Sequence, residues 1–451
     1  MDRRAFLQQC AAGSLCSLSG IPFAVKAANG AAAGLTSTVS FVTGSDRRQM
    51  VRDVLAPLVA QIGAGIEGKR IIVKPNFVYS AHPLCATHVD AVRGLLDVLR
   101  ELTAQPIIIG ESNASADVTR CFTEYGYTAL PGEYDNVELQ DLNTSQTVPV
   151  DGFSRKDGTA ATIGVLDPFL DPDAYVISIC RPKTHNCAVA TLTLKNHVMA
   201  APLLVSGNNQ KAAMHSGGYT PAESPVLANN IFHLANRTLP SLAIVDGYEG
   251  MEGDGPIGEP SWGDTVSPVA HRIALAGTDP VAVDAVGFAL MGIRPEHTYY
   301  VYLCGAAGLG NYSLSNIAIL GPDITSHIIP YRMHRTFDEQ IAWIPTAVAA
   351  RTSPAVQGIA PFLATERTDG RAGRVLLTFA FPFSTEARLS VCTLHARQVR
   401  EIAWPHYAPG RYSLWWDGRD DYGSPVATGN YMAVLKTGTG TAHHPVVWRR
   451  P

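Results

Sequence analysis

The stretch IVDGYEGMEGDGP, residues 244–256, joins the end of an apolar strand to a loop made mostly of glycines and carboxylates. Its carboxylates lie close together and each has a glycine beside it: Asp246, Glu249, Glu252 and Asp254. Glycines allow tight turns and a close approach of the backbone to a ligand. Carboxylates at this density repel one another unless a cation, a base or a proton relieves the repulsion. Because the loop follows a strand, it predicts a functional site; a solvated acidic loop is the alternative.

Apolar runs that alternate with helical patterns extend on both sides of this loop. The predicted strands are the short apolar runs at residues 70–73, 106–109, 175–179, 241–245, 271–276 and 317–320. Thr87 and Asp90 form a capping-box pattern ahead of helically spaced apolar residues, and Asp279 before Pro280 marks the start of a helix over residues 281–291. This alternation predicts an α/β domain with an open, mostly parallel sheet and helices on both faces.

Polar side chains follow the carboxyl ends of these strands, where open parallel sheets bind their ligands. Six residues are predicted to bind a ligand: Lys74, Asn76, Glu111, Ser112, Asn196 and His215. The first four stand at or just after strand ends, Asn196 follows the PKTH motif, and His215 lies next to paired glycines. Lys183, His185 and Lys195 are predicted to supply cationic and acid/base groups, and Asp254 a carboxylate base. For each histidine, a hydrogen-bonded structural role is the alternative. Together these residues predict a catalytic site for a small anionic ligand.

The carboxylate loop also has the ligand chemistry of a metal site. Asp246, Glu252 and Asp254 offer oxygen ligands to a hard divalent cation such as Mg²⁺ or Ca²⁺. His185 or His215 would add nitrogen for a transition metal. The spacing matches neither an EF-hand loop nor HExxH. A divalent metal cofactor is therefore one interpretation, and a mixed-charge pocket with the carboxylates facing the lysines is the other.

Composition limits the classes of protein that the chain can belong to. The chain has 451 residues, 46% of them hydrophobic and 16% charged, which is enough for two or three domains with sizeable cores. A formal net charge of -4 argues against nonspecific nucleic-acid binding. The sequence contains no CxxC pair, so no ferredoxin-type iron-sulfur motif is predicted. Beyond the N-terminal leader, no segment is long and apolar enough to predict a transmembrane helix.

Residues 1–28 have the pattern of an export signal. Arg3, Arg4, Phe6 and Leu7 follow the RRxFL order of twin-arginine signals, and a run of small and apolar residues comes next. The leader predicts a periplasmic or secreted protein; a cytoplasmic N-terminal helix is the alternative.

The chain changes character after the α/β domain, which we place at residues 37–325. Residues 326–373 are broken up by prolines and are predicted to form a helical and irregular connector. Short alternating strands fill residues 374–451, with turn signals such as Asp417-Gly418 between them. This pattern predicts a small all-β sandwich at the C-terminus.

Short motifs across residues 37–325 resemble the bacterial family called domain of unknown function 362. In chain order they are VKPNF (73–77), THVDAV (87–92), GES (110–112), PKTH (182–185), TLTLKN (191–196), DGYEGMEGDGP (246–256), DPVAVDAV (279–286) and GLG (308–310). Many relatives in this family carry ferredoxin-like cysteine motifs, which this chain lacks. The PKTH segment is also similar to lactate racemase-like proteins, which implies an isomerase or racemase as one class of enzyme; a metal-dependent enzyme is another.

WDGRDDYGSPVATGNYMAVL, residues 416–435, is similar to the immunoglobulin-like domain of flagellar hook-capping proteins. As a module appended to exported bacterial proteins, that domain implies structural support or docking onto an envelope protein. Two hypotheses follow from the sequence. The first is an exported enzyme that acts on a small anionic substrate, and the second is a noncatalytic periplasmic binding or scaffold protein.

Overall fold

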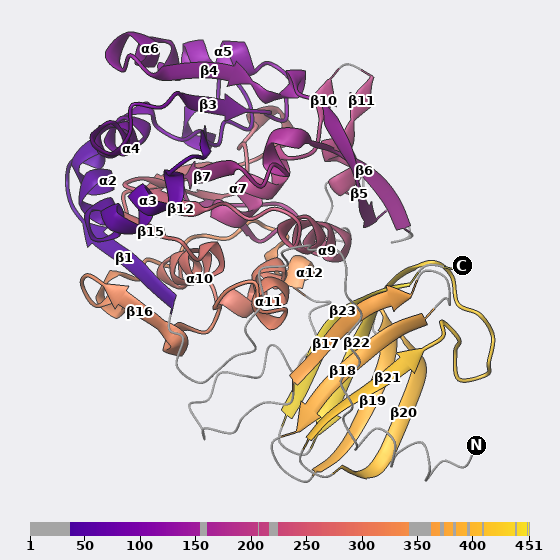
Figure 1. Ribbon diagram of the computed structural model, residues 1–451. Coiled ribbons are helices and arrows are strands. Elements are labelled where there is room, and N and C mark those ends of the chain that lie inside the picture. The colour runs from indigo at the N-terminus through magenta and orange to yellow at the C-terminus, as the bar shows by residue number, and fades with distance from the viewer. Residues whose placement is uncertain are drawn as a thin grey trace. The chain divides into compact units, whose positions relative to one another are not determined.

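The computed structural model of the chain describes residues 37–153, 160–205, 207–215, 224–341, 362–369, 374–381, 385–394, 397–407, 410–437, 440–448 and 450. An eight-stranded sheet forms the centre of the α/β domain, in the order β16-β1-β15-β12-β7-β2-β3-β4 (Figure 1). Its strands are β1 (Ser37–Thr43), β2 (Arg70–Lys74), β3 (Ile107–Glu111), β4 (Val137–Asp141), β7 (Ala174–Cys180), β12 (Leu242–Gly247), β15 (Ile273–Gly277) and β16 (Ile317–Leu320).

All neighbouring strands in this sheet run parallel except for β15, which is antiparallel to both β1 and β12. The predicted open, mostly parallel sheet is therefore confirmed. β1 and β4 are strands that the sequence patterns did not predict.

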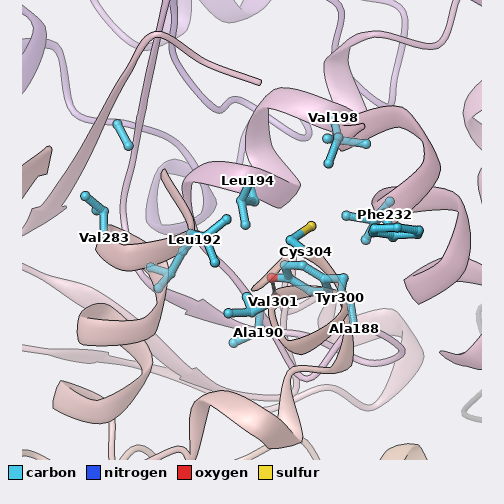
Figure 2. Close-up of a cluster of buried hydrophobic side chains, with 14 of the residues drawn as sticks. Ala188, Ala190, Leu192, Leu194, Val198, Phe232, Val283, Tyr300, Val301 and Cys304 are labelled. Atoms are coloured by element: carbon cyan, nitrogen blue, oxygen red, sulfur yellow. Dashed lines mark hydrogen bonds between the residues drawn. The ribbon is translucent and has the colours of Figure 1, made fainter. Parts of the chain in front are cut away.

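The strands β2, β3, β7, β12 and β15 are apolar at most positions because both faces of the sheet are buried there. On β2, Ile71 and Val73 belong to one core and Ile72 to the other, as the alternation of side chains along a strand requires. The first core packs against the helices α2 (Arg47–Leu55), α3 (Val59–Ile66), α4 (Val89–Leu102) and α5 (Val118–Glu124). The second packs against α7 (Thr193–Ala200), α9 (Ser224–Ala235), α10 (Pro280–Leu290) and α11 (Tyr299–Ala306). Figure 2 shows part of the second core, where Val198 of α7 lies beside Phe232 of α9.

Two of the predicted helix starts can be compared with the structure. Asp279 is the N-cap of α10, and its carboxylate accepts a hydrogen bond from the Ala282 backbone, as predicted. The capping-box prediction at Thr87 is wrong, because the N-cap of α4 is His88. The Thr87 hydroxyl instead donates to the carbonyl of Ile179, which ties this turn to the end of β7.

A second, four-stranded sheet continues from the main one, in the order β14-β13-β8-β9. Its strands are β8 (Lys183–Thr184), β9 (Ala190–Thr191), β13 (Gly250–Gly253) and β14 (Val266–Val269). The carboxylate loop thus leads from β12 of the main sheet into β13 of the small one. Two hairpins and three short helices complete the described part of this domain: β5 (Thr147–Phe153) with β6 (Ala160–Leu166), β10 (Leu204–Val205) with β11 (Asn208–Asn209), α6 (Leu130–Glu133), α8 (Gln210–Met214) and α12 (Phe337–Ile341).

The C-terminal residues form the predicted β-sandwich. One sheet has the order β17-β18-β21 and the other β20-β19-β22-β23. The strands are β17 (Phe362–Asp369), β18 (Arg374–Phe381), β19 (Thr385–Thr393), β20 (Gln398–Tyr407), β21 (Gly410–Trp416), β22 (Gly429–Thr437) and β23 (Gly440–Trp448). Phe379, Leu389 and Trp416 share one buried cluster between the two sheets. β17 pairs with β18 and lies within the stretch predicted as a connector, so this domain begins earlier than residue 374. Within the described ranges, no helix combines the length and the apolar character needed to cross a membrane.

Candidate functional site

A cavity of about 530 Å³ lies at the carboxyl ends of β2, β3 and β7. Eight of the predicted site residues line it: Lys74, Asn76, Glu111, Ser112, His185, Lys195, Asn196 and His215. β2, β3 and β7 are adjacent and parallel, which is why side chains from such distant parts of the chain meet there. Four other predicted residues are absent from the described lining: Lys183, Asp246, Glu252 and Asp254.

A network of buried polar side chains forms one part of the cavity lining. The Lys74 ammonium donates to Glu111 Oε2 at 2.9 Å and to Asn196 Oδ1 at 2.6 Å. Asn76 Nδ2 donates to the same Asn196 oxygen at 2.9 Å. Burial lowers the pKa of Lys74, while the Glu111 carboxylate opposes that shift. These four predicted ligand-binding residues therefore form a connected group whose members hold one another in place.

Lys183 lies behind this network. Its ammonium donates to the side-chain oxygen of Asn76 and to the carbonyl of Cys85. Burial lowers the pKa of Lys183 to about 8. Lys183 does not line the cavity, but its hydrogen bond can fix the position of Asn76, which does.

Lys211 is a functional candidate that the sequence patterns did not single out. It belongs to α8, is buried, and donates to Ser112 Oγ at 2.9 Å and to the carbonyl of Met199 at 2.6 Å. Burial lowers its pKa to about 7. The available signal was its position four residues before His215, at which spacing two helical residues lie on one face.

Lys195 differs from the other lysines of the cavity in having no partner among the described residues. Its side chain is only 6% exposed and lines the cavity, yet it makes no hydrogen bond or ion pair with any described residue. Burial, reinforced by the nearby charges of Lys183 and Lys74, lowers its pKa to about 8. The start of α7 is held by the buried carboxylate of Asp284, which accepts from the backbone of Thr193 at 2.8 Å and of Leu194 at 3.0 Å. This anchor fixes the turn that carries Lys195.

Two histidines lie side by side in the cavity lining. The rings of His185 and His215 are stacked with their centroids 5.9 Å apart, and the Cys187 thiol lies within 3.6 Å of a nitrogen of each ring. Burial, and after it the charge of Lys195, lowers the pKa of His185 well below its ordinary value, so His185 is neutral. His185 Nδ1 accepts from the Cys187 backbone at 3.1 Å, so the proton of the neutral ring is on Nε2. His185 therefore carries a hydrogen-bond donor that has no partner among the described residues.

Cations outnumber carboxylates around the cavity. The lysines Lys74, Lys183, Lys195 and Lys211 are buried in or near the lining, whereas Glu111 is the one buried carboxylate among the described lining residues. Asp264, the other lining carboxylate, is paired with Arg335 at 2.8 Å. Burying unpaired charge is costly, and the molecule can lower that cost by losing protons or by binding an anion. This arrangement favours an anionic ligand.

The carboxylates of the loop at residues 244–256 are held apart from one another by separate basic partners. Asp246 pairs with Arg47 of α2 at 3.2 Å. Glu252 accepts from the Arg332 backbone at 2.9 Å. Burial opposes ionisation of Asp254, but hydrogen bonds from Thr265 and Arg335 outweigh it, so its pKa lies below the ordinary value.

The predicted opposition of these carboxylates to the lysines is therefore not seen in the described lining, to which the loop contributes Gly255, Pro256 and Ile257 instead. In the ranges that the structure describes, no group of three or more His, Cys, Asp or Glu side chains is placed to hold a metal ion. Metal binding at the loop stays a prediction. Cys85, Cys121, Cys180, Cys304 and Cys392 are free thiols, and all but the last are buried.

The fold and the cavity define an α/β protein with a cavity at the carboxyl edge of its sheet. Residues 71–289, just under half of the chain, match the family described as Domain of unknown function (DUF362). All but one of the motifs that carried this resemblance in the sequence lie inside that range. No curated protein sequence matches the chain.

Among solved structures, the chain is similar to FlgD from P. aeruginosa, at 24% identity and a TM-score of 0.15. The match covers 16% of this chain and 61% of the FlgD chain. A TM-score this low does not establish a shared fold, so the resemblance of the C-terminal domain to hook-capping proteins stays a proposal.

Proposed function

We propose that this protein is an exported enzyme that binds a small anionic substrate in the cavity and transfers a proton on it. The observation that carries the proposal is Lys195, a buried lysine in the cavity lining whose amino group has no partner among the described residues. An unpartnered amine in a site rich in cations is suited to meet a ligand. The substrate acid group would occupy the space among Lys74, Lys195 and Lys211, where its charge offsets the cation excess.

The proton transfer that fits these groups takes place at the carbon next to the acid group. Burial lowers the pKa of Lys195 to about 8 in the empty cavity, and a bound acid group raises that pKa again. The base is therefore the fraction of Lys195 that is still neutral, which grows as the pH rises, and it accepts the proton from carbon. The electron pair of the broken C–H bond moves onto an oxygen of the acid group, which the lysine cations and the His185 Nε2 proton would stabilise. Return of the proton to the carbon completes an isomerase or racemase type of reaction.

The place of action in this proposal rests on the leader. Residues 1–28, which lie outside the described residues, have the twin-arginine pattern, so we propose a periplasmic or secreted location. The C-terminal β-sandwich would then be available to dock onto an envelope protein. A divalent metal remains an alternative that elemental analysis of the purified protein tests directly.

Hydrogen exchange tests the proposed chemistry. Incubation of the protein in D₂O with a panel of small carboxylic acids should replace the hydrogen next to the acid group, as followed by proton NMR. The Lys195→Met variant should abolish the exchange, and His185→Ala should slow it. Lys69→Met is the matched control, because Lys69 pairs with Asp173 at the surface at 3.0 Å and takes no part in the cavity.

Two results would count against this function. Exchange that survives Lys195→Met would remove Lys195 from the role of base. Acids that stabilise the protein against heat but never exchange would favour the noncatalytic binding protein instead.

A further inference from the structure

The loop after β13 contributes a second part of the cavity lining, and its charges are already paired. Arg335 donates to Asp264 Oδ1 at 2.8 Å and to the carbonyl of Gly263 at 3.0 Å. Glu259 accepts from the Ser261 backbone and lies 3.4 Å from His82. The groups this loop offers to the cavity include Pro256, Ile257 and Trp262. This part of the lining is therefore suited to an uncharged, apolar portion of a ligand.

Trp262 is placed unusually for a tryptophan. It lines the cavity and yet 64% of it is exposed. It ends a short 3-10 helix, Pro260–Trp262, which lies between Gly258 and Gly263; both glycines have a left-handed backbone, with φ of 76° and 74°. Residues other than glycine rarely adopt that backbone conformation, so these two glycines shape the turn that carries the indole. A large ring left in water at the edge of a cavity gains apolar contact only when something binds there.

The size of the cavity also exceeds what the acid group needs. About 530 Å³ is in the range of pockets that enclose ligands of drug size, roughly 300–1,000 Å³. A bare carboxylate or phosphate among the lysines would leave much of this space to water. The ligand should therefore have a body as well as an acid head.

We infer that the ligand is an acid carrying an aromatic ring, with the acid group among the buried lysines and the ring stacked on Trp262. The inference rests on the proposed anion-binding function and adds the class of ligand to it. Aromatic pairs gain from stacking beyond the apolar area that they bury, which favours an aromatic over an aliphatic body.

Two matched ligand pairs test the inference: acetate with phenylacetate, and inorganic phosphate with phenyl phosphate. Affinities are measured by calorimetry for the parent protein, Trp262→Ala and Trp415→Ala. The last is the matched control, an exposed tryptophan on β21 that does not line the cavity. In the parent and in Trp415→Ala, the ring should raise the affinity about tenfold or more for at least one head group. In Trp262→Ala that gain should fall below about threefold while binding of the bare head group is kept.

The outcomes separate the inference from the function on which it rests. If the bare anions bind and the ring adds nothing, the inference fails and the anion site stands. If the ring helps equally in Trp262→Ala, stacking on Trp262 is overturned. If neither anion nor its phenyl derivative binds, the anion site and the inference fail together. Trp262→Phe, which keeps a ring, should retain the gain and guards against misreading a folding defect.

Discussion

Binding of an anion to this cavity should weaken as the pH rises, because the anion needs lysines that the empty site holds only loosely protonated. In the empty cavity, burial sets the pKa of Lys195 at about 8. An anion beside the amine favours its charged form and raises the pKa again, so binding takes up protons. Below about pH 6, where Lys211 with its pKa of about 7 is protonated as well as Lys195, the affinity should be constant.

The size of the effect follows from that pKa. Above it, each pH unit costs about 1.4 kcal/mol of binding free energy for one proton taken up. Between about pH 7 and pH 9.5 the affinity should therefore fall about 30-fold, or about 2 kcal/mol. Lys211, whose pKa is about 7, and Lys183, whose pKa is about 8, would each make the fall steeper if they share in the uptake.

Sulfate is the probe of choice, since its own charge does not change over this range. Calorimetry in buffers of different ionisation enthalpy gives the number of protons taken up, which should be about one half per site from Lys195 alone at about pH 8. Lys195→Met should bind sulfate at least about tenfold more weakly at neutral pH and lose that share of the uptake. An affinity that stays constant from about pH 7 to pH 9.5, or equal proton uptake in the variant and the parent, would refute the reasoning.

Two further substitutions separate the binding and stability roles of buried charge. Glu111→Gln removes the partner of Lys74, so it should tighten sulfate binding. It should also lower the free energy of unfolding, measured by urea titration, by about 3 kcal/mol. The control Glu133→Gln, at a half-exposed pair with Arg93, should lower that free energy by less than about 1 kcal/mol. Looser sulfate binding in Glu111→Gln would contradict the charge argument. Asp284→Asn should lower the unfolding free energy by about 1–3 kcal/mol and weaken sulfate binding as well, because Asp284 holds the first turn of α7; a variant that loses stability with unchanged sulfate affinity would show that this anchor does not position Lys195.

Much of the site could be predicted because strand ends are visible in a sequence. Lys74 and Glu111 are the last residues of β2 and β3, and these apolar runs are easy to recognise. Parallel neighbours bring such ends to one edge of the sheet, so the residues that follow them meet without any knowledge of the side-chain geometry. Lys211 could not be found this way, because α8 reaches Ser112 through tertiary packing across 99 positions of the chain.

The carboxylate loop illustrates what strand ends do not reveal. Ile244 faces the core that packs against α2, and Asp246, two residues later on β12, faces the same side and meets Arg47. Val245, which lies between them, points to the opposite face of the sheet and belongs to the core on the side of α7. Alternation along a strand is visible in the sequence, but which face carries which helix is decided by the connections between strands, and the prediction lacked that information.

The position of β1 has a consequence for synthesis of the chain. β1 lies between β15 and β16 in the main sheet, although both come more than 220 residues later (Figure 1). Val39 and Phe41 are fully buried in the finished sheet, so their side chains cannot reach that burial until residue 320 has left the ribosome. The first strand is therefore synthesised long before its neighbours, and its apolar side chains need shielding from water in the meantime. The leader predicts export across the membrane in the folded state. Export therefore cannot begin before β16 has emerged from the ribosome.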